Sequence, residues 1–102
     1  MAKRTDIKVN APSSNPHICY IPREMERKVK YAKDKTGLSL YRILSESAGF
    51  SLSKKENIQR FKNQLKEFGY KTIGEWAVVL LEDMYNNKDG VIPAPYSKEK
   101  EQ

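Results

Sequence analysis

Residues 17–49, HICYIPREMERKVKYAKDKTGLSLYRILSESAG, decide the predicted fold. Residues 17–21 are β-prone and predict a short strand. Pro22 suits the first position of the helix that follows, because its missing N–H costs nothing there, and that helix runs over residues 22–35. Gly37 predicts a left-handed cap, after which an amphipathic pattern predicts a second helix. The stretch therefore predicts the order strand, helix, glycine turn, helix.

The rest of the chain shows similar patterns on both sides of this stretch. Residues 6–10 and 50–53 alternate polar and apolar side chains, which predicts two more short strands. Ser53 to Glu56 forms a capping box that opens a third helix, and Thr72 to Glu75 forms a second box that opens a fourth. The fourth helix has the widest apolar face, so we expect it to be the most buried element.

An offset of 32 residues places residues 20–37 over residues 52–69, with Gly37 on Gly69. This overlap indicates two halves, 17–49 and 50–87, each with the order strand, helix, turn, helix. Two capped helix hairpins can also look alike by chance. The predicted fold is mainly helical, with four helices, a small antiparallel β element and an internal dimer formed by the two halves.

The domain organisation follows from the same patterns. We expect a basic N-terminal arm with a short strand over residues 1–16, a compact domain over residues 17–90 and an extended charged tail over residues 91–102. A chain of 102 residues is typical of a single domain.

The positive charge is concentrated in one part of the chain. The net charge is +6, and the first 71 residues hold 16 of the 19 cations but only 7 of the 13 carboxylates. Such a field attracts a polyanion, and DNA is the most common one in a cytoplasm. The alternative is a solvated basic surface without a partner.

Other classes of protein are not expected. No apolar run approaches the roughly 20 residues needed to cross a bilayer, and no secretion signal is visible. The single cysteine, Cys19, fits a reducing compartment, so we expect a cytoplasmic protein without a membrane partner. No phosphate-binding glycine loop, nucleophile elbow or metal-ligand cluster is present, and His17 with Cys19 does not make a zinc site. We therefore expect no catalysis, no cofactor and no metal.

The pattern of His17 to Gly49, with its Thr36-Gly37-Leu38-Ser39 turn, resembles the ribbon-helix-helix family of DNA-binding proteins, the Arc, MetJ and CopG type. Residues 50–85 look similar. The resemblance implies an antiparallel ribbon of two strands that enters the major groove of double-stranded DNA, with a phosphate at the start of each second helix. One departure is that the strand 17–21 has no basic or amide residue, which counts against base readout by this strand.

The size and layout are also similar to the TraN-like accessory proteins of conjugative elements from Gram-positive bacteria. This resemblance implies a role in transcription regulation or conjugative transfer, with other proteins of such a complex as further partners. An internal dimer would run as a monomer, whereas one ribbon-helix-helix unit per chain would give a homodimer.

The candidate DNA contacts are cations and helix starts. Ser39 and Thr72 begin helices whose free N–H groups bind phosphate, although their ordinary role is capping. Lys54 and Lys55 oppose the dipole at a helix start, which indicates another use, although solvated lysines are common there. Arg42 would face base edges if its helix enters the groove. The full set is Lys3, Arg4, Lys8, His17, Arg23, Arg27, Lys28, Ser39, Arg42, Lys54, Lys55, Arg60, Lys71 and Thr72.

Two alternatives stay open. Lys3, Arg4 and Lys8 form either an arm along a DNA groove or a tail without a role. The whole protein is alternatively an interaction module, in which the apolar face of the fourth helix, with Trp76 and Leu80, docks a partner while the basic field meets an acidic surface.

Overall fold

The computed structural model describes residues 6–11, 17–88 and 91–95. It confirms a mainly helical fold with a small antiparallel sheet of two strands. In chain order the elements are β1 (Ile7–Asn10), β2 (His17–Ile21), a 3₁₀ turn (Arg23–Met25), α1 (Glu26–Thr36), α2 (Leu40–Ala48), α3 (Lys55–Glu67) and α4 (Ile73–Asn87).

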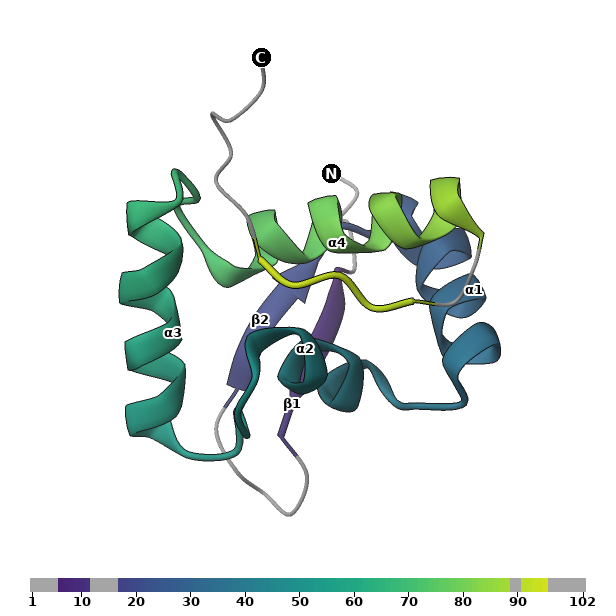
Figure 1. Cartoon of the computed structure of the whole chain (residues 1–102). Helices are drawn as coiled ribbons and strands as arrows, with labels where there is room; N and C mark the ends of the chain where they lie inside the picture. Colours follow the sequence, from purple (N-terminus) through teal and green to yellow (C-terminus); the bar gives the residue numbers. More distant parts are fainter. Residues whose placement is uncertain (1–5, 12–16, 89–90, 96–102) are drawn as a thin grey trace, which may run out of the picture.

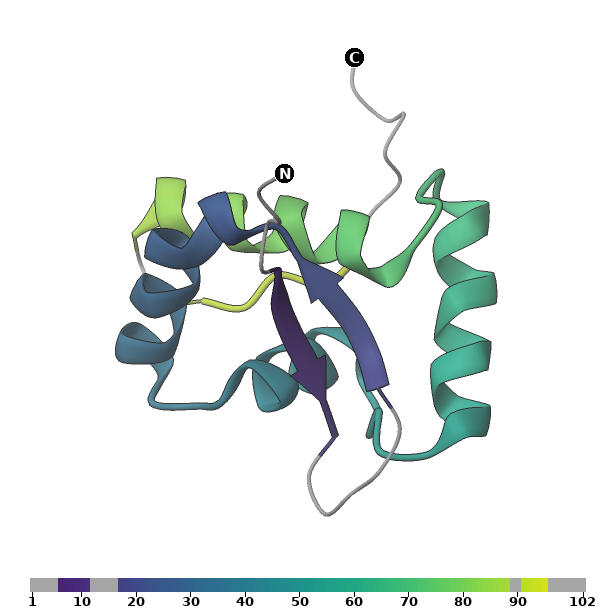
Figure 2. The ribbon, with the colours of Figure 1, turned by 180° about the vertical axis from the view of Figure 1, so that it is seen from behind.

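The β1–β2 hairpin lies at the centre of the molecule (Figure 1). Helices α2 and α4 lie on one side of it, while α1 and α3 stand at opposite ends of α4. Seen from behind, the hairpin lies in front of the helices, and its outer face is open to solvent (Figure 2). The fold therefore presents one face of a two-stranded ribbon between two flanking helices.

Helix α4 supplies the centre of the core, as predicted. None of its residues from Ile73 to Tyr85 is exposed, and Trp76 packs edge-on against Phe61 with 4.8 Å between ring centroids. Trp76 and Leu80 are each 2% exposed, so their apolar face is covered by the chain itself. The docking face expected for the interaction module is therefore not available to a partner in this structure.

Gly74 lets α4 begin directly against the end of β2. A Cβ atom at this position would lie 2.4 Å from the main-chain oxygen of Tyr20. Real Cβ atoms do not approach a carbonyl oxygen so closely, so a side chain here would push the helix off the strand. The contact fixes the backbone of Tyr20 beneath the start of α4.

The third predicted strand is wrong. Residues 50–53 form no strand, and the partner of β2 is β1. Local hydrogen bonds replace strand pairing, because the Leu52 N–H donates to the Ser45 hydroxyl and the Ser53 N–H donates to the Ser51 hydroxyl. The second half therefore lacks the strand that a ribbon between two halves requires, and in the described residues the ribbon is a single hairpin.

The strand predicted at residues 6–10 is confirmed as β1, so Lys8 belongs to the sheet and not to an arm. Lys8 lies in β1, whereas Lys3 and Arg4 lie outside the described residues. In the described part of the chain, no helix has both the length and the apolar character needed to span a lipid bilayer.

Candidate nucleic-acid interface

A β-bulge in β2 decides which side chains reach the outer face of the hairpin. Val9 pairs with Cys19 and Asn10 pairs with His17, so Ile18 is an extra residue without an opposite partner. The bulge reverses the alternation of β2 at this point. Ile18 and Cys19 are both buried, while His17 is exposed on the same side as Tyr20.

Four side chains form this outer face, which we call the ribbon face: Lys8, Asn10, His17 and Tyr20. Lys8 pairs with Tyr20 across the two strands. The His17 Nδ1 and Asn10 Oδ1 atoms are 3.3 Å apart, and the His17 and Tyr20 ring centroids are 4.3 Å apart. The ribbon face therefore combines a cation, an amide and two adjacent rings, and β1 supplies the basic and amide groups that β2 lacks.

The environment of His17 favours its neutral form. Burial and, to a smaller extent, the positive charge of Lys8 lower the pKa of His17 below its ordinary value of 6.5. Cys19 lies on the opposite side of the ribbon, where burial raises the pKa of its thiol to about 12. The two residues point to different faces, so they do not form a shared metal site.

The start of α2 lies beside β1. Ser39 caps the helix as predicted, since its hydroxyl accepts a hydrogen bond from the Arg42 N–H at 3.3 Å. A surface hollow of about 510 Å³ is lined by Lys8, Asn10, Ser39 and Arg42 among others. The structure therefore brings three of the predicted contacts, Lys8, Ser39 and Arg42, to one place at the edge of the ribbon face.

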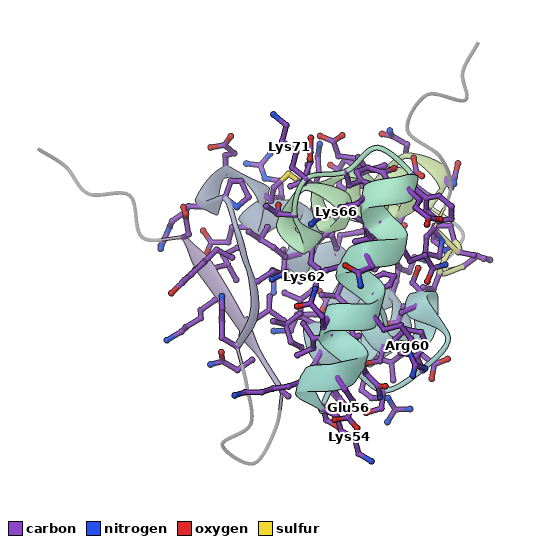
Figure 3. All side chains as sticks on the ribbon, turned by 90° about the vertical axis from the view of Figure 1, so that its left-hand side faces the viewer. Lys54, Glu56, Arg60, Lys62, Lys66 and Lys71 are labelled. Atoms are coloured by element: carbon purple, nitrogen blue, oxygen red, sulfur yellow. The ribbon has the colours of Figure 1, made fainter. Side chains whose placement is uncertain are left out.

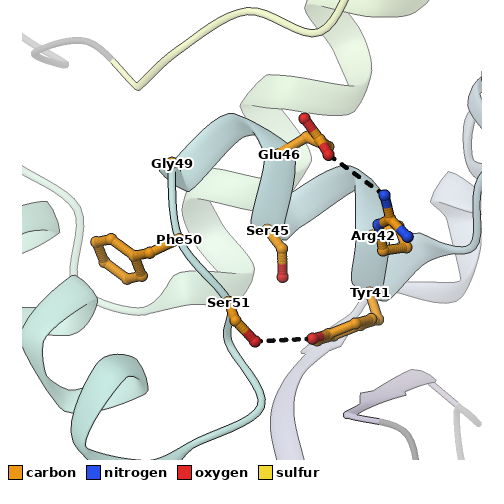
Figure 4. A pocket seen from close by; sticks show the side chains of 7 residues that line it. All are labelled: Tyr41, Arg42, Ser45, Glu46, Gly49, Phe50 and Ser51. Carbon is orange, nitrogen blue, oxygen red and sulfur yellow. Dashed lines mark hydrogen bonds and ion pairs between the residues drawn. The ribbon is translucent and has the colours of Figure 1, made fainter.

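Arg42 also borders a second hollow, of about 450 Å³, between α2 and the residues that follow it (Figure 4). Its guanidinium lies 3.5 Å from the Glu46 carboxylate. The Tyr41 hydroxyl is 3.0 Å from the Ser51 hydroxyl, and this hydrogen bond is the main cause that lowers the pKa of Tyr41. In this arrangement Arg42 is turned toward Glu46, and a ligand of Arg42 has to compete with that carboxylate.

Helix α3 has a strongly basic outer surface. Ile58, Phe61 and Leu65 are buried, and the cations lie on the exposed side together with two carboxylates, Glu56 and Glu67. No ion pair to these cations is found in the part of the chain that the structure describes. The cations are Lys54, Lys55, Arg60, Lys62 and Lys66.

Figure 3 shows how these cations are divided between the two sides of α3. Lys62 and Lys66 lie on the side nearer the hairpin, and Arg60 lies on the far side. Lys54 is at the start of the helix, where it is the N-cap residue without a side-chain capping bond. The predicted capping role of Ser53 is therefore wrong. Of the labelled cations of α3, Lys62 and Lys66 are the ones nearer the hairpin.

Several cations of α1 and of the 3₁₀ turn before it form ion pairs with carboxylates, in contrast to the cations of α3. Ion pairs join Arg23 to Glu26 at 3.7 Å, Lys30 to Asp34 at 3.9 Å and Lys28 to Glu82 at 3.6 Å. Three predicted contacts, Arg23, Arg27 and Lys28, line a hollow of about 380 Å³ beside Tyr85. That hollow lies where the start of α1 meets the end of α4, and it shares no residue with the hollow at the start of α2.

Thr72 caps α4 as predicted, because its hydroxyl accepts a hydrogen bond from the Glu75 N–H at 3.0 Å. The Glu75 carboxylate accepts a hydrogen bond from the Lys71 N–H at 2.7 Å. A negative charge thus already lies at this helix start, and it opposes a phosphate there. Lys71 and Thr72 are weaker candidate contacts than Ser39.

Comparisons with protein-family models, with curated proteins and with solved structures give no match. The site is therefore defined by the geometry and charge of the chain itself. Sequence reasoning missed Asn10, Tyr20, Lys62 and Lys66. Asn10 is the only one with a local signal, an amide within an alternating strand, while the others depend on the bulge and on the position of α3.

Proposed function

We propose that the protein binds double-stranded DNA through the ribbon face and the adjoining side of α3. The observation that carries this proposal is the exposed outer face of the hairpin, which presents Lys8, Asn10 and His17. The lysines on the nearer side of α3 extend its positive charge (Figure 3). A two-stranded ribbon fits the major groove, where amide and cationic side chains hydrogen-bond to base edges.

The residues divide into two roles. Lys8 and Asn10 are the proposed base contacts, because lysine suits the acceptors of guanine and asparagine suits adenine. Lys62 and Lys66 are the proposed phosphate contacts that set the position of the ribbon without reading sequence. The start of α2 at Ser39 adds backbone N–H groups at the edge of the same face.

The biological role is proposed on the resemblance alone. The ribbon-helix-helix and TraN-like resemblances support transcription regulation or an accessory role in conjugative transfer, in the cytoplasm. The hairpin differs from the ribbon of that family, in which the two strands come from two chains or two halves.

Salt dependence tests the proposal. Fluorescence anisotropy with a mixed-sequence duplex should show binding that weakens steeply from low to physiological salt. Changing Lys62→Gln and Lys66→Gln together should lower the slope of log affinity against log salt by about 0.9 for each phosphate that the protein no longer neutralises. The charge-matched control is Lys30→Gln with Lys35→Gln on α1, where Lys30 is already paired with Asp34.

The control pair should change the slope less than the α3 pair. Equal slopes for the two double variants would show that only net charge matters and would remove α3 from the interface. Failure of the wild-type protein to bind duplex DNA at low salt would refute the function itself.

A further inference from the structure

The two rings of the ribbon face are available to a ligand. The Tyr20 side chain is 53% exposed, and its ring leans against that of His17 with an interplanar angle of 46°. His17 and Tyr20 are the exposed residues of β2, whereas Ile18, Cys19 and Ile21 are buried. An exposed aromatic ring on a sheet offers a flat surface on which another planar ring can stack.

The ring pair is held in place before any ligand arrives. The Asn10 side chain bonds to the imidazole of His17, and the β-bulge places that imidazole next to Tyr20. The backbone of Tyr20 is fixed beneath Gly74 at the start of α4. A surface that is already ordered loses little conformational entropy when it binds, so stacking on it is more favourable.

Cations lie on the hairpin that carries the rings and on the helix next to it. Lys8 is the cross-strand partner of Tyr20, and Lys62 and Lys66 are on the side of α3 nearer the hairpin (Figure 3). Aromatic rings within a basic track are the arrangement by which proteins bind single-stranded nucleic acid. In a duplex the faces of the bases are covered by their neighbours, so only an unpaired base exposes a face to a ring.

We propose that the Tyr20–His17 ring pair is a stacking platform for one unpaired base, so that the protein prefers DNA in which a single strand continues from a duplex. This inference rests on the proposed function, because the lysines that hold the duplex backbone also hold the strand that leads to the platform. The neutral imidazole of His17 adds a second ring face without adding charge.

Three fluorescent DNAs test the platform in the full-length protein: a blunt duplex, the same duplex with a single-stranded extension, and the single strand alone. The wild-type protein should bind the extended duplex more tightly than the blunt one. Tyr20→Ala should weaken binding to the extended duplex about 5- to 150-fold, as expected when one base stack is removed, and should weaken binding to the blunt duplex much less.

The matched control is Tyr20→Phe, which keeps the ring and removes the hydroxyl. It should bind the extended duplex as the wild type does, and the salt slope of Tyr20→Ala should equal that of the wild type because stacking neutralises no phosphate. Circular dichroism of each variant establishes that the helices are intact. If Tyr20→Ala does not fold, the affinities of the wild type and of Tyr20→Phe for the blunt and the extended duplex still test whether the platform binds an unpaired base.

The outcomes separate this inference from the proposed function. Equal wild-type affinity for blunt and extended duplex, or an equal loss in Tyr20→Phe and Tyr20→Ala, overturns the platform and leaves duplex binding in place. Binding to the single strand without any binding to the blunt duplex overturns the proposed function and supports the platform.

Discussion

Asn10 and His17 face each other across the hairpin, with the amide oxygen 3.3 Å from Nδ1 of the ring. The two residues lie seven positions apart in the sequence, and they meet because Ile18 is the extra residue of a β-bulge. Without the bulge, His17 would point into the core with Cys19. The bulge therefore creates the polar face of the ribbon. It also places the His17 ring on that face, and the protonation of this ring can be measured through its effect on the stability of the protein.

His17 predicts a dependence of stability on pH. In the unfolded chain its pKa is the ordinary 6.5, and in the folded protein burial and Lys8 lower it. Between the two values the unfolded state binds more protons, so the free energy of unfolding falls as the pH falls below 6.5 and levels off below the folded pKa. Urea unfolding of the wild type and of His17→Gln at about pH 7.5 and about pH 5.5 measures this contribution.

The wild type should lose more stability than His17→Gln between the two pH values, since the variant keeps every other titrating group. A larger loss in the variant would mean that protonated His17 is stabilised in the folded state, contrary to the influence of Lys8.

Replacing Gly74 by alanine should lower the stability of the protein, which is the opposite of the usual effect of this substitution in a helix. Replacing a helical glycine by alanine ordinarily stabilises a protein by about 1 kcal/mol. Here the added methyl group would lie 2.4 Å from the Tyr20 carbonyl oxygen, so Gly74→Ala should destabilise the protein by roughly 1–3 kcal/mol. The measurement is the free energy of unfolding in urea.

Gly37 provides the contrasting control. It has a φ of 72° and no atom within 4 Å of an added Cβ, so only its backbone conformation resists a side chain. Gly37→Asn should therefore be tolerated better than Gly74→Ala, because asparagine adopts the left-handed region more readily than other residues. A stabilising effect of Gly74→Ala would show that the start of α4 lies farther from β2 than described.

The helices were predictable because their signals are local. Gly37 and Gly49 end α1 and α2 in the left-handed conformation, and Ser39 and Thr72 cap α2 and α4 through their hydroxyls. The spacing of apolar residues also placed the most buried helix correctly. Each of these features depends on residues within one or two turns of the chain.

The arrangement of the site was not predictable from such signals. The β-prone composition of residues 17–21 predicts a strand but does not place the bulge at Ile18 that reverses its alternation. The pairing of Lys28 with Glu82 joins two helices that are far apart in the sequence, whereas the local spacing would pair Lys28 with Glu24, four residues before it. The strand predicted at residues 50–53 failed because alternation does not reveal that nearby serine hydroxyls take up the backbone N–H groups.

The capping pattern predicts that removing three different hydroxyl groups lowers the free energy of unfolding by different amounts. Ser39→Ala and Thr72→Ala should each lower the free energy of unfolding by about 1 kcal/mol, because each removes an acceptor for a helix N–H. Ser53→Ala should cost less than about 0.5 kcal/mol, since the N-cap of α3 is Lys54. Thermal or urea unfolding of the three variants gives the comparison. A cost for Ser53→Ala equal to the other two would restore the capping box predicted for α3.

The hairpin also predicts the oligomeric state. In the ribbon-helix-helix family the ribbon needs two chains or two halves, whereas here β2 is paired with β1 of the same chain and the apolar face of α4 lies in its own core. We therefore expect a monomer of 11.8 kDa in solution without DNA, at concentrations up to tens of micromolar. Sedimentation equilibrium measures the mass directly. A stable dimer would contradict this expectation and would indicate that the open edges of the hairpin pair between chains.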